Sequence, residues 1–363
     1  MTPHGQKEIV ITGIGVVTSV GYQAPQTLTS ILAGICRFKE LSSFQAKVRD
    51  PSQHFPEPAI AAPASALTDG LVGIERLLAL GRPALQEALA DANLDDKDLV
   101  DTEVLLAGGQ RPETAAASRT GTVLGARLIA PIARGMRLPA PRYFPAGSAG
   151  ALLALDVGMQ RMQQGQCRRC VVGGVDSWLD TETLAELDRI RRLKTAEIPD
   201  GFLPGEAAAF VVIERAVDAA RRRRTAYARC SGVFTAQESS TIEGNGVCTA
   251  QALSSCLRGA VDGLRRNGKL ARAVLCDLNG ESYRSTEWAY ALARVFQGDR
   301  SPPPATLTHP ADCVGDVGAA TGALLLALGA HAINHEPGIW DATLVWCSSD
   351  KGERAACSLE SPS

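Results

Sequence analysis

At 363 residues, 45% of them hydrophobic and 21% charged, the chain is long enough to form two domains or one double domain with large cores. A formal net charge of −2 gives no reason to expect nucleic acid or a membrane surface as a partner, and no apolar run approaches the roughly 18 residues that span a bilayer. Residues 1–8 are polar and lead directly into a strand pattern, so we expect no signal peptide and a cytoplasmic location.

The ten cysteines are scattered, and in a cytosolic chain we interpret most of them as small buried hydrophobic residues. Cys167 and Cys170 have the spacing of a metal or redox pair, but no second pair of ligands accompanies them. The one basic run, residues 221–224, follows an alanine-rich stretch and is interpreted as a solvated helix end. We therefore expect neither a metal site nor a cofactor.

In chain order, apolar runs bounded by glycine or proline predict strands at residues 9–17, 104–109, 171–172, 206–214, 226–234, 272–277 and 345–347, the last with a hairpin partner at 355–359. Apolar residues at helical spacing predict helices at 25–34, 74–93, 152–162, 215–223, 249–266, 284–297 and from 317 onward. Residues 38–68 contain four prolines and predict a long loop, whereas residues 110–145 carry little pattern.

The stretch from Ala146 to Gly174 is the centre of this arrangement. Small residues open a tight turn before an apolar helix, and a short buried strand follows. Many α/β enzymes present a nucleophile at such a turn, and here the turn carries Ser148. Residues 315–329 repeat the pattern with a second apolar helix. Two similar α/β halves with such helices predict helices sandwiched between two sheets.

Three motifs carry a resemblance to a known family: IVITGIGVVTSVG from Ile9, CVVGGVDS from Cys170 and DGFLPGEAAAFVVIE from Asp200. Because these three motifs occur in this order, the chain resembles the β-ketoacyl-(acyl carrier protein) synthases of the thiolase-like superfamily over nearly its whole length. The resemblance implies a five-layer α-β-α-β-α fold with mixed sheets. Its two pseudo-repeated halves would cover residues 1–219 and 220–363, with dimerisation through the first half.

At the positions where the family carries out chemistry, the sequence departs from the pattern. The family's nucleophilic cysteine falls on Ser148 when no gap is allowed, or on Gly147 after a shift of one residue. Its two histidines fall on Asn279 and Asp316, a lysine falls on Ala311, and the glycine-rich gating loop falls on residues 350–356. A serine hydroxyl needs an adjacent base to become nucleophilic, and a carboxylate has the wrong charge to stabilise an oxyanion.

These departures predict a catalytically inactive synthase-like protein that acts as a dimerising accessory or adaptor. The partner could be a ketosynthase-like protein, as for chain-length factors in fatty-acid or polyketide synthesis, with acyl carrier protein a further candidate. A secreted effector of a bacterial secretion system, such as type VI, is another. The alternative is a serine-dependent acyltransferase or thioesterase, with Ser148 as nucleophile, Asp316 as base and Asn279 as oxyanion donor. We predict that these three side chains share one pocket and that Ser148 is mainly a helix N-cap.

Other polar residues receive structural interpretations. Pro310 separates His309 from Cys313, so we do not expect a paired Cys-His site there. His331 and His335 lie near a helix C-terminus, which favours imidazolium over a metal site. Glu206 is expected to accept hydrogen bonds from backbone amides around its turn.

Overall fold

The computed structural model describes residues 8–362 except 49–51, 53–54, 111–114, 134–135, 137, 245, 298–301 and 337. Ten strands of this part of the chain form one mixed sheet in the order β10-β9-β11-β12-β8-β1-β7-β6-β4-β5. In the first half the strands are β1 (Ile9–Val17), β4 (Thr102–Ala107), β5 (Arg142–Phe144), β6 (Arg169–Ser177) and β7 (Glu206–Arg215). In the second half they are β8 (Ala228–Gln237), β9 (Ala273–Cys276), β10 (Thr306–Thr308), β11 (Ala342–Ser348) and β12 (Glu353–Glu360).

The two halves repeat one topology. In the first, β1, β7 and β6 pair antiparallel and β4 and β5 continue in parallel; in the second, β8, β12 and β11 pair antiparallel and β9 and β10 continue in parallel. The hairpin predicted at the C-terminal end is therefore confirmed. The two halves of the sheet are continuous, because β1 pairs with β8 through Ile9, Val10 and Ile11 and joins them edge to edge.

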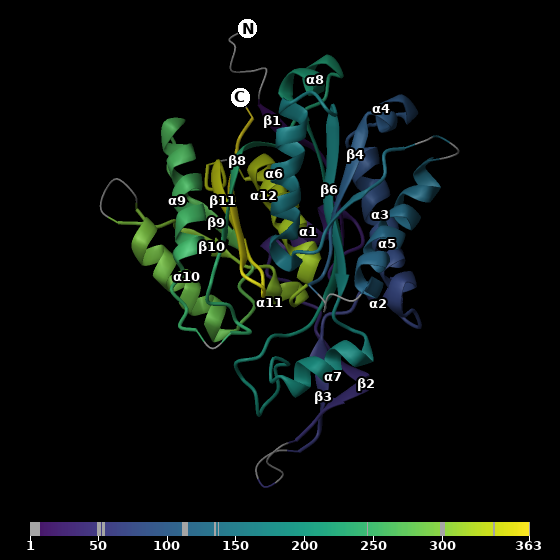
Figure 1. The fold of residues 1–363 in the computed structure, drawn as a ribbon, viewed down its shortest axis with the longest axis vertical. Helices are drawn as coiled ribbons and strands as arrows, with labels where there is room; N and C mark the ends of the chain where they lie inside the picture. The colour runs from purple at the N-terminus through teal and green to yellow at the C-terminus, as the bar shows by residue number, and fades with distance from the viewer. Residues whose placement is uncertain are drawn as a thin grey trace.

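The joined sheet folds around a central helical layer and is covered outside by two more (Figure 1). The centre holds α6 (Gly150–Gln163) and α12 (Thr321–His335), and α12 is buried from Thr321 through Ile333 because it packs on every side. Helices α3 (Gly73–Asp91) and α5 (Ala115–Ala133) cover the first half, and α9 (Gln251–Arg266) and α10 (Ser282–Val295) cover the second. This confirms the expected five layers.

The segment from 38 to 68 is not a long loop. It forms an antiparallel pair, β2 (Lys39–Ala46) and β3 (Glu57–Ala61), followed by the short helix α2 (Ser65–Thr68). The pair packs on α7 (Thr181–Arg189) through a small apolar cluster and extends beyond one end of the main body (Figure 1). Short helices elsewhere are α1 (Ala24–Leu32), α4 (Asp96–Val100), α8 (Ala216–Arg221) and α11 (Ala311–Val314).

Two short 3₁₀ turns bring the halves together at the centre. Turn η1 (Gly147–Ala149) precedes α6 and turn η2 (Gly318–Ala320) precedes α12, and the two are in contact. Each begins with a glycine at positive φ, +51° at Gly147 and +53° at Gly318, a conformation that side chains with a Cβ disfavour. Gly174 of β6 lets η2 approach, since a Cβ there would lie 2.1 Å from the Ala319 carbonyl oxygen.

The basic run at 221–224 is not simply a solvated helix end. Arg222 donates to Glu214, a fully buried carboxylate of β7, and Arg224 pairs with Asp91 at the end of α3. These two side chains tie the end of α8 to β7 and to α3, and carboxylates neutralise part of the positive charge of the run.

Candidate functional site

Ser148 lies inside turn η1, and its side chain is buried. The prediction that it caps α6 is wrong: α6 begins at Gly150, its N-cap position is Ala149, and no side chain caps it. A capping residue stands just before the helix with an extended backbone. Ser148 instead lies inside the 3₁₀ turn, so it does not occupy that position. Its hydroxyl forms no hydrogen bond within the described part of the chain.

Ser148 borders a cavity of about 40 Å³ between the two turns. The prediction that it shares a pocket with Asp316 is confirmed, but Asn279 borders a separate cavity of about 10 Å³ behind Asp316. Small-molecule sites in proteins typically have roughly 300–1,000 Å³. The cavity beside Ser148 therefore has room for water but not for a substrate. Its lining residues are Gly109, Gln110, Gly147, Ser148, Asp176, Trp178, Arg284, Asp316, Gly318 and Asp350.

Both carboxylate oxygens of Asp316 already accept hydrogen bonds. Oδ1 accepts from Trp178 Nε1 at 3.1 Å and from the Gly318 amide at 2.8 Å, and Oδ2 accepts from Asn279 Nδ2 at 2.8 Å. The carboxylate thus caps turn η2 and links it to the first half through Trp178. No hydrogen bond joins Asp316 to Ser148 in the described structure, so the pair does not form a base–nucleophile dyad as it stands.

The amide of Asn279 is likewise engaged. Its Nδ2 donates to Glu281 Oε2 at 2.9 Å as well as to Asp316, and its Oδ1 accepts from the Glu281 backbone amide at 3.1 Å. An oxyanion donor must point a free N–H into the place where the charge develops. In this arrangement the Asn279 side chain closes the loop before α10 and offers no such hydrogen.

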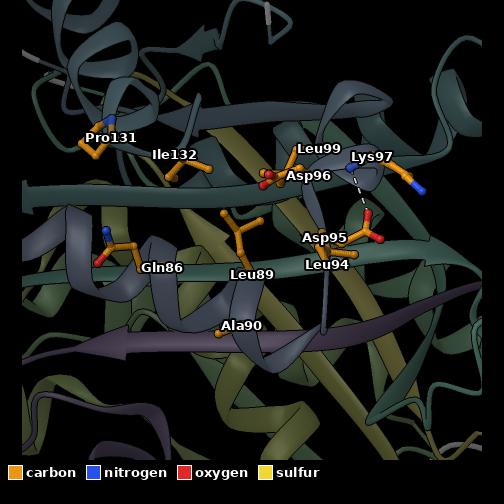
Figure 2. Close-up of a pocket in the computed structure, with 10 residues that line it drawn as sticks. All are labelled: Gln86, Leu89, Ala90, Leu94, Asp95, Asp96, Lys97, Leu99, Pro131 and Ile132. Atoms are coloured by element: carbon orange, nitrogen blue, oxygen red, sulfur yellow. Dashed lines mark hydrogen bonds between the residues drawn. The ribbon is translucent and has the colours of Figure 1, made fainter. Parts of the chain in front are cut away.

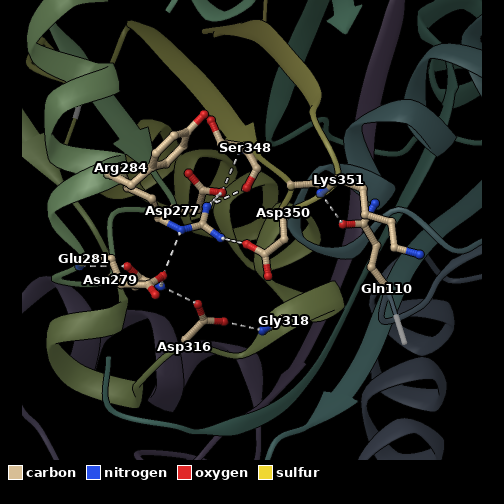
Figure 3. A network of polar contacts seen from close by, with 12 residues as sticks. Gln110, Asp277, Asn279, Glu281, Arg284, Asp316, Gly318, Ser348, Asp350 and Lys351 are labelled. Atoms are coloured by element: carbon tan, nitrogen blue, oxygen red, sulfur yellow. Dashed lines mark hydrogen bonds and ion pairs between the residues drawn. The ribbon is translucent and has the colours of Figure 1, made fainter. Parts of the chain in front are cut away.

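Two arginines link the charged residues beside the cavity, and Figure 3 shows one of them, Arg284. The buried Arg284 lies between Asp277, 2.9 Å from Nη1, and Asp350, 3.0 Å from Nη2. Arg192, from the segment after α7, makes a two-pronged contact with Glu281 at 2.7 and 2.8 Å and also pairs with Asp350 at 2.8 Å. Such paired geometry is the strong form of an Arg–carboxylate interaction. The network links the two halves by charge.

The buried charges shift one another's pKa values. Burial raises the pKa of Asp277 to about 7, although Arg284 opposes the shift, and its Oδ1 has no hydrogen-bond partner in the described structure. Burial also raises the pKa of Asp350, but the guanidinium groups of Arg192 and Arg284 outweigh it and hold that pKa below its usual value. The carboxylates of four residues lie near the guanidinium groups of Arg192 and Arg284; they are Asp277, Glu281, Asp316 and Asp350. A proton on Asp277 therefore relieves the excess of negative charge.

The segment that falls on the family's gating loop is a tight turn held at several points. Asp350 is bound by both arginines, and Gly352 has a φ of +107° that favours glycine. Gln110 bridges to it from the first half: its side chain accepts from the Lys351 amide at 3.2 Å (Figure 3) and donates to Glu353 at 2.7 Å. These contacts fix the segment over the cavity.

Sequence reasoning missed the residues that make this site polar. These residues come from separate elements, and no spacing along the sequence predicts that they meet; they are Trp178, Arg192, Asp277 and Arg284. One signal was available in part: Asp350 begins the segment 350–356 that departs from the family's gating loop, and a carboxylate needs a cation nearby once the fold buries it. Which cation supplies it is decided only by the tertiary contacts.

The other polar residues follow their structural interpretations with one correction. His309 pairs with Asp312 at 3.0 Å rather than with Cys313. His331 and His335 stack with ring centroids 4.0 Å apart, but burial lowers the pKa of His331 to about 4, so His331 is neutral and not the expected imidazolium. Within the described residues, no group of three or more His, Cys, Asp and Glu side chains could hold a metal ion.

Glu206 is structural, as predicted, and fully buried. Its contacts reach further than its own turn: it accepts from the Ala64 amide at 2.8 Å, from Ser177 Oγ at 2.8 Å and from Arg76 Nε at 2.6 Å. The carboxylate therefore ties β6, α2 and α3 together beneath the site.

A larger depression lies elsewhere. It measures about 650 Å³ between α3, α4 and α5, and its walls carry Leu89, Leu94 and Ile132 beside the acidic Asp95 and Asp96 (Figure 2). Among the described residues, no buried side-chain polar atom without a hydrogen-bond partner lines it, so this part of the chain does not give it the convergent polar groups of a ligand site. None of the helices in the described ranges is long and apolar enough to cross a membrane.

A family model for the N-terminal domain of beta-ketoacyl synthase matches residues 6–219, which is more than half of the chain. No match is found among curated proteins.

Solved structures share the fold at low identity. A type II polyketide synthase ketosynthase, solved in complex with its acyl carrier protein, is 15% identical with a TM-score of 0.78, covering 98% of this chain and 100% of that one. The ishigamide ketosynthase/chain length factor is 17% identical with a TM-score of 0.77, covering 99% and 100%. The ketosynthase from module 6 of the bacillaene synthase of Bacillus subtilis is 17% identical with a TM-score of 0.77, covering 98% and 72%.

Proposed function

The chain belongs to the beta-ketoacyl synthase family, and on that premise we propose that it is a member without condensing activity that works by binding a partner protein. One observation carries the proposal. The position at which the family would place its nucleophile opens onto only about 40 Å³, and the polar groups around it are bound to one another. A substrate would have to displace a buried charge network in order to enter.

The proposed loss of chemistry follows residue by residue from the resemblance. Ser148, or Gly147 after a shift of one residue, stands for the nucleophile, and Asn279 and Asp316 stand for the two histidines. A serine hydroxyl stays protonated near neutral pH unless a base accepts its proton. The carboxylate of Asp316 accepts three hydrogen bonds from other donors, and both amide hydrogens of Asn279 are engaged. Neither group is left to serve Ser148.

Decarboxylation of malonyl acyl carrier protein by the purified chain tests this directly. We expect no turnover above the enzyme-free rate. Ser148→Cys is the matched variant: it restores a thiol at the turn, and we expect it to remain inactive because the cavity and the engaged partners are unchanged. Turnover by the wild-type chain contradicts the proposal.

We propose that the chain dimerises through its first half, either with itself or with a ketosynthase-like protein. The outer strand β5 pairs with β4 on one side, and no described strand pairs with its other edge. An unpaired edge is a template for adding a further strand. The boundary between residues 219 and 220 stays a prediction, because the two halves share a continuous sheet.

The identity of the partner separates the accessory role from the adaptor role. The solved relatives include a ketosynthase bound to its acyl carrier protein and a ketosynthase/chain length factor. An accessory protein should co-purify from native cells with an active ketosynthase or an acyl carrier protein. A secretion adaptor should instead co-purify with a secreted effector or spike component. Mass spectrometry of the isolated complex distinguishes these outcomes, and a chain recovered without any of them counts against both.

The serine-enzyme alternative rests on the unbonded hydroxyl of Ser148 beside the cavity. It predicts that an acyl-thioester or fluorophosphonate probe labels Ser148 and that Ser148→Ala abolishes the labelling. We expect no labelling, because no base contacts the hydroxyl. Labelling confined to Ser148 would replace a binding role with an acyl-transfer role.

A further inference from the structure

Two cysteines face each other away from the site described above. Cys167 lies in the turn between α6 and β6, and Cys170 is the second residue of β6. Their sulfur atoms are 3.5 Å apart, close enough for one thiol to donate to the other. Neither takes part in the charge network around Ser148, so the proposed function does not use them.

The surroundings of the two sulfurs differ. Cys170 is fully buried beneath α6, where a Cβ on Gly158 would lie 3.3 Å from its sulfur. Cys167 is 9% exposed and sits in a turn whose other residues, 163–166 and Arg168, are exposed. Cys167 therefore lies at the solvent-facing side of the pair, and Cys170 lies on its inner side.

The contact between the two sulfurs favours a thiolate at Cys167. The hydrogen bond from Cys170 lowers the pKa of the Cys167 thiol, burial and the carboxylate of Glu103 oppose this, and the guanidinium groups of Arg161 and Arg142 add to the lowering. The same contact, together with burial, raises the pKa of Cys170. Cys167 thus lies nearer to solvent and has the lowered pKa, and Cys170 is fully buried beside it.

We propose that Cys167 and Cys170 form a redox-reactive dithiol that a small-molecule disulfide, such as glutathione disulfide, oxidises to an intramolecular disulfide. The Cys167 thiolate attacks one sulfur of glutathione disulfide, the glutathione S–S bond breaks, and one glutathione thiolate leaves. Cys170 then loses its proton to the solvent and attacks the Cys167 sulfur, which expels the second glutathione. The two cysteines lose two electrons and two protons, and one glutathione disulfide becomes two thiols.

The turn can accommodate the bond. The sulfurs must approach from 3.5 Å to about 2 Å. The exposed residues 164–166 connect the end of α6 to Cys167 and lie outside the sheet, so this connection can shift while β6 keeps its pairing. The pair also lies near Glu103 of β4, which binds Arg161 of α6 at 2.5 Å and Arg142 of β5 at 3.6 Å.

Tryptic mapping of the full-length protein reads out the bond directly. Trypsin cuts after Arg161, Arg168, Arg169 and Arg189, so Cys167 and Cys170 fall on separate peptides, 162–168 and 170–189. The reduced folded protein is incubated with glutathione disulfide, alkylated to block remaining thiols, and digested without reductant. We expect the two peptides to appear as one cross-linked species that separates on reduction. Reaction of the exposed Cys36 in the same sample shows that the oxidant was active.

Two variants test the assigned roles. In Cys170→Ser the mixed disulfide should accumulate on Cys167 by on the order of tenfold over wild type, because no thiol resolves it. In Cys167→Ser, Cys170 should stay reduced while the protein is folded. Thermal unfolding of each variant verifies that it has folded. Absence of the cross-linked peptide from wild type, once Cys36 has reacted, overturns the proposal, as does modification of Cys170 in folded Cys167→Ser.

Discussion

The two central helices begin with nearly the same turn, but the turns are held by different chemistry. Turn η1 follows Ala146 at φ −122° and ψ 28°, and turn η2 follows Val317 at φ −110° and ψ 18°. In η2, carboxylates bind the amides: Asp316 accepts from Gly318 and Asp176 accepts from Ala319. In η1 a hydroxyl does so, since Ser349 Oγ accepts from the Ala149 amide at 3.0 Å.

Each turn is bound by a side chain from the opposite half of the molecule. Asp176 comes from β6 of the first half and binds the turn of the second, whereas Ser349 follows β11 of the second half and binds the turn of the first. Each half therefore stabilises the other's central helix. The carboxylates give η2 a charged, cross-linked support. Turn η1, which carries Ser148, keeps a neutral one, so substitutions at the two turns should differ in cost.

Gly174→Ala should produce the largest effect. Its Cβ would lie 2.1 Å from the Ala319 carbonyl oxygen, which belongs to backbone and cannot swing away. We expect a loss of about 4 kcal/mol or more, or failure to fold, because strand and turn must separate. Urea unfolding followed by circular dichroism measures this. Gly165→Ala is a control for a glycine that meets nothing within 4 Å, although its positive φ adds a smaller cost.

Asp316→Ala should be the next most costly. It leaves the Gly318 amide, Trp178 Nε1 and one hydrogen of Asn279 without their acceptor. We expect about 3 kcal/mol of destabilisation, since each buried unsatisfied donor costs about 1–3 kcal/mol before relaxation. Asp316→Asn should recover part of the loss by keeping one acceptor. Equal stability of Asp316→Ala and wild type would show that the carboxylate does not hold η2.

Asp277→Asn should reveal how the charge cluster depends on pH. The folded pKa of Asp277 is raised to about 7 from 3.8, so its contribution to stability is complete below pH 4 and is lost as the pH rises through 7. The amide mimics the protonated form, so the variant should gain on the order of 2 kcal/mol over wild type at pH 8 and nothing at pH 4. Denaturation midpoints at both pH values test this. A pH-independent difference would contradict the assignment.

Ser349→Ala should cost about 1 kcal/mol, as expected for a side chain that accepts from one turn amide and donates to the Ala146 carbonyl. The neutral support predicts that this loss does not change between pH 5 and pH 8. Thermal shift measurements at the two pH values are sufficient. A loss as large as that of Asp316→Ala would erase the contrast between the turns.

Ser148→Ala should have the smallest effect, within about 0.5 kcal/mol, because the hydroxyl makes no hydrogen bond in the described structure. Calorimetry of the variant beside wild type measures it. A strong destabilisation would mean that the hydroxyl holds the turn after all.

Much of the fold could be predicted from the sequence wherever a buried face places apolar residues at a regular spacing. The strand at 9–17 and the helix near 74–93 were found because each packs apolar residues at a fixed spacing. Strand β2 was missed because its side chains are mostly exposed and polar, and it is held by its pairing with β3 and by α7. Helix α5 was missed because Gly121 and Gly125 weaken its pattern. Both positions need glycine, since Tyr143 and Pro141 lie against them.

The sequence by itself determined the repeated halves, the two apolar central helices and the place of Ser148 at a tight turn, because these follow from local spacing and from glycine's backbone freedom. Tertiary structure alone decided what surrounds that turn. Arg192, Arg284 and Trp178 reach the cavity from distant segments, and Asp316 turns its carboxylate to Trp178 and Gly318 rather than to Ser148. Hydrogen-bond partners are fixed by direction and burial in three dimensions, which no spacing along the chain records.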